Sequence, residues 1–416
     1  MNRREMLAAS IVQGTMIGGA FAATADAGRT ESGPSALGFP AKSEFSVGEG
    51  CYLDSGSMHP IGKGARSALD SYLKFRSFSP DAPPRKGFEE DEVRAKFARL
   101  INASPDEIAF VQSTTTGENL VLQVLGLPAK GAHVVTDTLH FFGSLPIYSE
   151  MEKAGVEVTW IVPRDGKILL DDIEKAVRKG TRLVALSQVS TINGFEHDLK
   201  KVCEIAHAKG ALVYADIVHA AGCVPVDVRA TGVDFAACAS YKWLMGDFGL
   251  GFLYVRKDRQ ALLQPPYMGY HQIKSFTPHY LPFDPPGNGV ADYARFEGAT
   301  GLFGQGTFSF ATAALLNHSL DYIQNLGVKA IQAHAQTMIE RLKAELPRKG
   351  YSVYTPPDAR TPMVACLMPN ARQVLSPIMA QEKIRITTSA NRFRVSVSVF
   401  NDMNDVERLL AVLPSR

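Results

Sequence analysis

The chain has 416 residues, enough for one large α/β subunit or two or three average domains, so a small module held by disulfides or metal is excluded. Hydrophobic residues make up 45% and charged residues 21%, the proportions of a folded globular protein rather than a disordered one. Lysine and arginine number 44 against 42 aspartates and glutamates, which leaves no basic excess and argues against a nucleic-acid partner.

The first segment has the features of a targeting signal. Paired arginines at residues 3–4 precede an uncharged, moderately apolar run over 6–25, and small residues at 25–27 offer a cleavage site. This order is typical of a secretory signal, and the paired arginines indicate the twin-arginine type read by the Tat export machinery. We therefore expect removal of residues 1–27, a periplasmic or secreted mature protein, and no membrane partner after cleavage. An uncleaved anchor is the alternative, but so many Gly, Ala, Ser and Thr residues suit a bilayer poorly.

Beyond the signal, short apolar runs alternate with segments of helical period. Residues 28–50, rich in Gly, Ser, Pro and Ala, are expected to form a poorly ordered tail. The alternation that begins near residue 106 predicts a mostly parallel sheet with helices on both faces. The predicted strands are 108–111, 133–136, 156–162, 183–186, 212–214, 235–238 and 252–255, and the predicted helices are 116–126, 143–153, 170–178 and 198–209.

The pattern changes in the last third of the chain. Residues 264–290 contain many prolines and turn residues, which predicts a long loop. Long helices with short strands after residue 300 predict a smaller α+β domain. The elements expected there are helices 309–325, 328–347 and 402–413 and strands 351–354, 363–367, 385–388 and 393–398. We therefore expect a large domain over 51–300 and a small C-terminal domain over 301–416.

Candidate catalytic residues follow the predicted strands. Lys242 lies just after strand 235–238, and Asp216 closes the strand that starts at residue 212, with His219 three residues later. A buried carboxylate is costly unless it pairs with a cation, and the pyridinium nitrogen of pyridoxal phosphate is one such cation. A solvated lysine and a turn-capping aspartate are the alternatives for each residue taken alone.

A candidate phosphate site lies at the helix that follows strand 108–111. Thr114 and Thr115 stand at the start of that helix, where backbone N–H groups can bind one phosphate. An ordinary N-cap has the same sequence appearance. His140, past strand 133–136, either lies flat on a cofactor ring or caps a loop. The ten histidines show no H-E-x-x-H spacing, so no metal site is predicted.

Together these motifs resemble the class V aminotransferase family of fold-type I enzymes, which use pyridoxal 5'-phosphate. The resemblance covers about residues 50–413, and it implies a seven-stranded, mostly parallel sheet, a small C-terminal α+β domain and a homodimer with shared active sites. It rests on Tyr52-Leu53-Asp54-Ser55-Gly56, Thr114-Thr115, His140, Asp216-x-x-His219, Ser240-Tyr241-Lys242-Trp243, Arg295-Phe296-Glu297-Gly298-Ala299-Thr300 and Phe393-Arg394-Val395-Ser396.

The resemblance implies a role for four residues in the chemistry. Lys242 would form the Schiff base with the cofactor and later move the α-proton of the substrate. Asp216 would pair with the pyridine nitrogen, and His140 would stack on the ring. Arg394 would bind the α-carboxylate of the substrate, a group that guanidinium holds with two parallel hydrogen bonds.

Further residues would hold the cofactor. The resemblance assigns its phosphate to hydroxyl-bearing side chains of one subunit and to a threonine of the neighbouring subunit, and it places a histidine beside the 3-oxygen. The hydroxyl-bearing residues are Thr114, Thr115, Tyr241 and Ser240; the threonine from the neighbour is Thr300, and the histidine is His219.

The chain departs from the cysteine desulfurases of this family. Those enzymes carry a nucleophilic cysteine on a loop before the carboxylate-binding arginine, but residues 367–393 contain no cysteine. Cys366 lies in an apolar run and is expected to be a buried strand residue, as Cys203 and Cys223 are expected to be packing residues. Thr191 stands where desulfurases carry an asparagine. Desulfuration through an enzyme persulfide is therefore not expected.

Three functional hypotheses remain open. The leading one is an enzyme that acts on the α-carbon of a small amino-acid-like substrate by transamination or epimerisation. A β-elimination or C–S lyase reaction, of the selenocysteine lyase or kynureninase type, is the alternative within the same chemistry. A non-catalytic binding protein on this fold is the third, although joint retention of Lys242, Asp216 and Arg394 argues against it.

Overall fold

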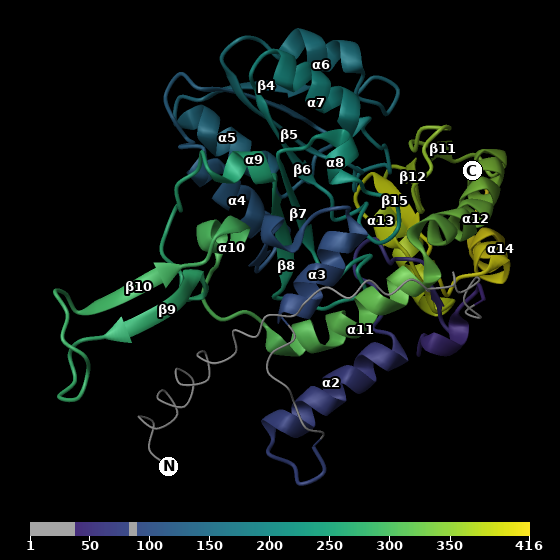
Figure 1. Cartoon of the computed structure of the whole chain (residues 1–416). Helices are drawn as coiled ribbons and strands as arrows, with labels where there is room; N and C mark the ends of the chain where they lie inside the picture. Colours follow the sequence, from purple (N-terminus) through teal and green to yellow (C-terminus); the bar gives the residue numbers. More distant parts are fainter. Residues whose placement is uncertain (1–37, 83–89) are drawn as a thin grey trace, which may run out of the picture. The chain divides into compact units, whose positions relative to one another are not determined.

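The computed structural model describes residues 38–82 and 90–416 (Figure 1). The hairpin Ile273–Phe296 belongs to one compact unit, and the other described residues form a second. The expected signal 1–27 and residues 28–37 of the expected tail lie outside the described residues. The described end of that tail is packed, because Ala41 and Phe45 are buried. No helix among the described residues is long and apolar enough to cross a membrane.

The larger unit is built on a seven-stranded sheet in the order β2-β8-β7-β6-β5-β3-β4. The strands are β2 (Ile108–Val111), β3 (His133–Asp137), β4 (Glu157–Ile161), β5 (Thr181–Ser187), β6 (Leu212–Asp216), β7 (Phe235–Ala239) and β8 (Gly251–Val255). Four neighbouring pairs are parallel, and β8 alone runs against the rest, since it is antiparallel to both β2 and β7. The prediction of a mostly parallel seven-stranded sheet is confirmed.

Helices cover both faces of this sheet (Figure 1). Successive side chains of a strand point to opposite faces, so Val213 and Ala215 pack into one core and Tyr214 into the other. The first core includes α3 (Glu90–Leu100), α6 (Leu170–Ala176), α7 (Leu199–Ala208) and α11 (Phe310–Leu326), and the second includes α4 (Thr114–Val124), α5 (Leu145–Lys153) and α10 (Gly298–Phe303). Strands buried on both faces are nearly continuous hydrophobic runs, which made them predictable.

A four-stranded sheet, in the order β11-β12-β15-β14, forms the C-terminal part. Its strands are β11 (Ser352–Val353), β12 (Met363–Leu367), β14 (Thr387–Thr388) and β15 (Arg392–Ser396), and its core includes α12 (Val328–Arg348), α13 (Ala371–Gln381) and α14 (Met403–Val412). The N-terminal strand β1 (Cys51–Tyr52) joins this part by pairing with β13 (Ile384–Arg385). By contrast, α11 packs on α2 (Lys63–Arg76) and α3 beside the large sheet, so the division at residue 301 does not match the packing.

The prediction of a long loop over 264–290 is wrong, because this segment contains the first strand of a β-hairpin. In this hairpin β9 (Ile273–Pro278) pairs antiparallel with β10 (Ala291–Arg295). Most residues of both strands are exposed, so the alternation of buried and exposed side chains that marks a strand is missing. The short helices α8 (Val228–Thr231), α9 (Lys257–Gln260), η2 (Lys42–Glu44), η3 (Pro105–Glu107) and η4 (Tyr270–Gln272) complete the described elements.

Candidate active site

The candidate site lies at one edge of the large sheet. The parallel strands β3, β5, β6 and β7 end there, so residues that follow them in sequence come together in space. Asp216 is the last residue of β6, and Lys242 lies three residues past β7. His140 lies three residues past β3.

A cavity of about 90 Å³ opens at this edge. It brings together five of the ten residues that the sequence predicted, and it adds an aromatic side chain, Phe141, whose ring centroid is 5.7 Å from Nζ of Lys242. The lining residues are Ser113, Thr114, Thr115, Phe141, Asp216, Val218, Ala239, Tyr241 and Lys242.

Lys242 is buried, and its environment favours the neutral amine. Nζ lies 3.0 Å from Nε2 of His219. Burial lowers the pKa of Lys242 to about 8, because the charged form loses its hydration; the Asp216 carboxylate opposes this shift and the Arg394 guanidinium adds to it. A buried lysine with a depressed pKa can act as a nucleophile toward a carbonyl and as a base toward a C–H bond.

Asp216 is buried and close to several positive charges. Burial raises the pKa of its carboxyl group, while the charges of His140 and Lys242 act in the opposite direction. The backbone N–H of Val218 donates to Oδ1 at 2.9 Å. A buried carboxylate in this position fits a cationic ring nitrogen, which would stabilise its ionised form.

His140 is part of a buried pair that the sequence did not reveal. Its Nε2 lies 3.1 Å from Oε1 of Glu118, and its Nδ1 lies 2.8 Å from Oγ of Ser187. Glu118 also accepts hydrogen bonds from Ser144 and Tyr148, both at 2.6 Å. Burial alone would lower the pKa of His140, but the Glu118 carboxylate raises it above its usual range. Glu118 thus favours a protonated imidazole at the edge where the ring of a cofactor would lie.

We expect Glu118→Gln to lower stability most in mildly acidic solution. Because the pKa of His140 is raised in the folded protein, this histidine stabilises the fold fully at a pH below 6.5, the ordinary histidine pKa. The contribution is lost as the pH rises through the raised pKa. The lowered pKa of Glu118, where burial is outweighed by His140, stabilises the fold above the ordinary value of 4.5. The variant should therefore lose about 1–3 kcal/mol between these pH values and less at alkaline pH.

Thermal unfolding of both proteins at pH 5.5 and pH 9 measures this difference. Glu150→Gln, on the exposed side of α5, is the matched control, since its ion pair with Lys153 is solvent-exposed and contributes little. An equal loss of stability at both pH values would contradict the proposed charge pair.

The start of α4 forms the anion-binding side of the cavity. Ser113 caps the helix by accepting from the backbone N–H of Thr116 at 3.1 Å, and Oγ1 of Thr114 accepts from the backbone N–H of Ala239 at 3.0 Å. A Cβ on Gly117 would lie 2.9 Å from Cβ of Ala237, so glycine allows α4 to approach β7 closely. The first turn of α4 therefore presents backbone N–H groups to the cavity, as a phosphate requires.

Two of the predicted phosphate ligands do not line this cavity. The hydroxyl of Ser240 lies within hydrogen-bond distance of the backbone oxygens of Asp247 (2.6 Å) and Leu250 (2.8 Å), so its single proton is used within its own turn. Thr300 lies in α10, with its hydroxyl 3.5 Å from the backbone oxygen of Ile108. Its expected role is at the site of a neighbouring subunit, so it stays a prediction.

Arg394 extends from β15 of the small sheet and is buried. Its Nη1 donates to the backbone oxygen and Oγ1 of Thr191, at 2.9 and 2.7 Å, and its Nη2 donates to Ser57 at 3.0 Å. Oδ1 of Asp54 lies 3.8 Å from Nη2. Burial lowers the pKa of Arg394 to about 10, with Asp54 opposing the shift. A buried cation that touches mostly neutral groups is suited to an incoming carboxylate.

The fold and the site define an enzyme that depends on pyridoxal 5'-phosphate, and the comparisons agree. The model of the family "Aminotransferase class-V" matches residues 86–409, so the chain belongs to this family. A "Probable cysteine desulfurase" of Methanothermobacter thermautotrophicus is 32% identical over 300 residues, 70% of this chain and 71% of that protein. The "Uncharacterized aminotransferase YcbU" of Bacillus subtilis is 26% identical over 351 residues, 84% of this chain and 89% of that protein.

Solved structures show the same fold. The apo cysteine desulfurase from Thermococcus onnurineus NA1 has a TM-score of 0.75 and 26% identity over 88% of this chain and 94% of that chain. A cystine C-S lyase named C-DES has a TM-score of 0.74 and 18% identity over 88% of this chain and 97% of that chain. The prediction of a fold-type I enzyme with pyridoxal 5'-phosphate as cofactor is confirmed.

The residues present fit this cofactor. Lys242 would offer an amine to its aldehyde, Asp216 would offer a carboxylate to its ring nitrogen, and the first turn of α4 would offer N–H groups to its phosphate. When bound, pyridoxal 5'-phosphate supplies an electron sink that weakens the bonds at the α-carbon of an amino acid. The protein supplies position and protons: Arg394 can orient a carboxylate, and Lys242 can take a proton from the adjacent carbon.

Proposed function

We propose that the chain is a lyase that breaks the bond between Cβ and sulfur in a small amino acid such as cysteine or cystine. The support comes from relatives named "Probable cysteine desulfurase" with 32% and 29% identity, each matched over 70% or more of this chain. Lys242 provides the base that an elimination needs at the α-carbon, and Arg394 provides the cation that would hold the carboxylate of an amino acid.

The burial of the cysteines supports direct elimination, a reaction in which no thiol of the protein takes part. All five thiols are free and buried. Burial raises the pKa of Cys51, Cys203 and Cys366 to about 12, so these thiols are poor nucleophiles. Because residues 367–393 lack a cysteine, sulfur would leave on a small molecule rather than on the protein. With cysteine the overall reaction is cysteine plus water to pyruvate, ammonia and hydrogen sulfide.

Product analysis of the purified protein tests this proposal. Pyruvate, ammonia and sulfide formed in equal amounts from L-cysteine, or pyruvate, ammonia and cysteine persulfide from L-cystine, would support elimination. A variant in which all five cysteines are replaced by alanine or serine should retain this activity if it folds. Formation of alanine with sulfur bound to the protein would contradict direct elimination.

Transamination or epimerisation is the second candidate. Both reactions begin with the same removal of an α-proton by Lys242, and the relative YcbU is named as an aminotransferase. Incubation with L- and D-amino acids separates the outcomes, because transamination gives a keto acid with the amine left on the cofactor and epimerisation gives the other enantiomer. Absence of both products over a broad panel of amino acids would exclude this candidate.

We also propose that the enzyme is a homodimer in which Thr300 reaches the cofactor phosphate of the partner. The exposed apolar side chains of the hairpin support an interface, since Phe283 is 100% exposed, Val290 77% and Tyr293 60%. We expect Phe283→Ser with Tyr293→Ser to weaken dimerisation about 30-fold. Light scattering across a dilution series measures this, and Phe78→Ser, at an exposed site outside the hairpin, is the control. An unchanged dimer in the double variant would contradict this interface.

We propose that the chain is exported by the twin-arginine route. The paired arginines at 3–4 and the uncharged run 6–25 support it. In a bacterial host, the full chain with Arg3→Lys and Arg4→Lys should accumulate in the cytoplasm, while the unaltered chain appears in the periplasm or medium. Equal distribution of the two proteins would contradict this route.

A further inference from the structure

Three buried side chains form a chain of hydrogen bonds that ends at the catalytic lysine. Nε1 of Trp243 lies 3.3 Å from Nδ1 of His219, and Nε2 of His219 lies 3.0 Å from Nζ of Lys242. The exposed fractions of Trp243 and His219 are both 2%, and that of Lys242 is 6%. Water therefore has little access to the three nitrogens, and each proton position depends on its neighbours.

The positions of the protons follow from the chemistry of each group. An indole N–H can only donate, so Nδ1 of His219 must present a lone pair to Trp243. Burial, together with the charges of Arg394 and Arg392, lowers the pKa of His219 well below its usual range, so the imidazole is neutral. A neutral imidazole carries one proton, which must then lie on Nε2. This proton points toward Nζ of Lys242, and only a neutral amine can accept it.

We infer that Trp243 is a positioning residue that fixes the tautomer of His219 and, through it, favours the neutral, reactive form of Lys242. If Lys242 were protonated, its ammonium would have to donate to Nε2 of His219. The imidazole proton would then move to Nδ1 and face the N–H of Trp243, donor against donor. The indole therefore makes protonation of Lys242 unfavourable through two successive hydrogen bonds, from Trp243 to His219 and from His219 to the lysine.

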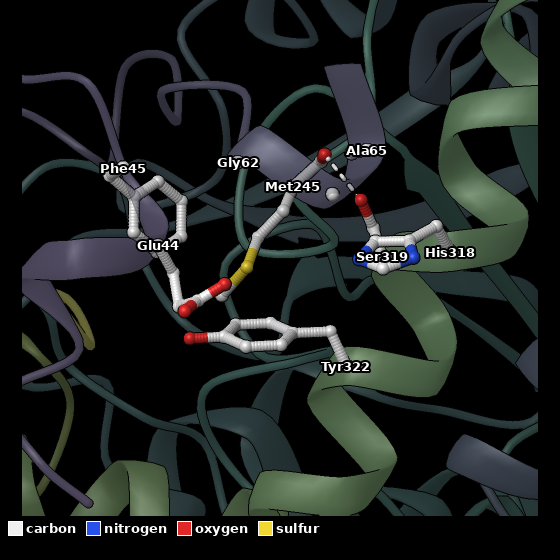
Figure 2. A pocket seen from close by; sticks show the side chains of 9 residues that line it. Glu44, Phe45, Gly62, Ala65, Met245, His318, Ser319 and Tyr322 are labelled. Carbon is white, nitrogen blue, oxygen red and sulfur yellow. Dashed lines mark hydrogen bonds between the residues drawn. The ribbon is translucent and has the colours of Figure 1, made fainter. Parts of the chain in front are cut away.

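The local backbone holds this arrangement in place. Gly222, with φ of +95°, follows His219 by three residues, and a Cβ there would lie 2.4 Å from the backbone oxygen of Trp243. On the other side of Trp243, the backbone oxygen of Met245 accepts a hydrogen bond from Ser319 of α11 at 2.9 Å (Figure 2). The backbone of the turn that carries Trp243 is thus held on both sides, and its indole is buried in the core beside the large sheet.

Other groups near Lys242 and His219 also influence the pKa values of these two residues. The groups that influence Lys242 are Asp216, Arg394 and Cys238, and those that influence His219 are Lys242, Arg394 and Arg392. None of them is changed by a substitution at Trp243. A shift caused by such a substitution can therefore be attributed to the lost N–H donor if packing is preserved.

Trp243→Phe keeps an aromatic ring and removes the donor. We expect the pKa of Lys242 to rise by about half to one unit, because one hydrogen bond then no longer opposes the ammonium form. The measurement uses the full chain freed of cofactor: the rate at which the visible band appears on mixing with pyridoxal 5'-phosphate is recorded against pH. The midpoint of this profile should move to higher pH in the variant.

Two controls separate this role from general packing. Trp160→Phe removes the only other indole of the chain and should leave the midpoint unchanged. In a His219→Phe background no imidazole connects the indole to the lysine, so adding Trp243→Phe should then cause no further shift. A purely structural role of Trp243 would shift the midpoint equally in both backgrounds, which would overturn the inference.

Nitrogen NMR of the unaltered chain gives a readout that does not depend on any substitution at Trp243. In cofactor-free protein labelled with ¹⁵N-histidine, the His219 signals are those lost in His219→Phe. A protonated Nε2 with an unprotonated Nδ1 would support the inference, and a protonated Nδ1 would overturn it. Neither measurement depends on the substrate or on the outcome of the reaction, so failure of the proposed lyase activity leaves this test intact.

Discussion

Lys242→Ala should yield a protein that cannot hold pyridoxal 5'-phosphate covalently and that turns over at least about 10³-fold more slowly. Lys242 is the buried amine of the candidate cavity, and its pKa of about 8 leaves a neutral fraction that is suited both to attachment and to proton transfer. The visible spectrum and the mass after borohydride reduction measure attachment, and product formation from cysteine or another accepted amino acid measures turnover.

A matched substitution at the surface controls for the loss of a lysine. Lys209, at the end of α7, is exposed, and Lys209→Ala should retain the visible band and full turnover. If Lys242→Ala retained both, the assignment of the catalytic lysine would be wrong. If Lys242→Ala lost the band but kept full biological activity, the chain would be a binding protein on this fold rather than an enzyme.

The centre of the site was predictable because it depends on topology. Asp216 and Lys242 follow strands that the sequence marks as continuous apolar runs, and parallel strands bring their carboxyl ends to one edge. The pairing of β6 with β7 confirmed that these strands are neighbours, and the cavity confirmed that both residues face the same space.

Residues that act through unusual burial were not predictable. Glu118 lies in the first turns of α4, where a glutamate normally faces solvent, but here its carboxylate is enclosed by His140, Ser144 and Tyr148. These partners lie 22 to 30 positions away in the sequence, so no local sequence pattern predicts the contact. The link from Trp243 to His219 likewise depends on two ring orientations that sequence spacing does not define.

Ser240 is a residue whose type and sequence position suggested a contact that its hydroxyl does not make. Its position beside Tyr241 and Lys242 suggested a phosphate ligand, yet the tight turn after β7 directs Oγ to backbone oxygens of its own loop. A Cβ on Gly246 would lie 2.7 Å from Cβ of Ser240, which shows how closely the chain folds back at this point. Local backbone geometry, rather than residue type, decided where this hydroxyl points.

Arg394→Lys should raise the KM for an amino-acid substrate about 100-fold while changing kcat less, because the charge remains but the planar fork is lost. A guanidinium can bind both oxygens of a carboxylate at once, whereas an ammonium offers a single point charge. The present partners of Arg394 are Thr191, Ser57 and Thr387, which accept from its two terminal nitrogens and fix the orientation of the planar group. Within the described residues its Nε has no hydrogen-bond partner, so the group has capacity left for a ligand.

Arg385→Lys is the matched control for this variant. Arg385 also lies near Asp54, at 3.7 Å, but its side chain is 58% exposed and makes only a surface ion pair with that carboxylate. Its KM should change less than about twofold. The comparison can be sharpened with a substrate amide that lacks the carboxylate: such a compound should bind the unaltered enzyme and Arg394→Lys equally weakly. If instead the amide discriminated between them as strongly as the acid does, Arg394 would support the fold of the site and would not bind the carboxylate.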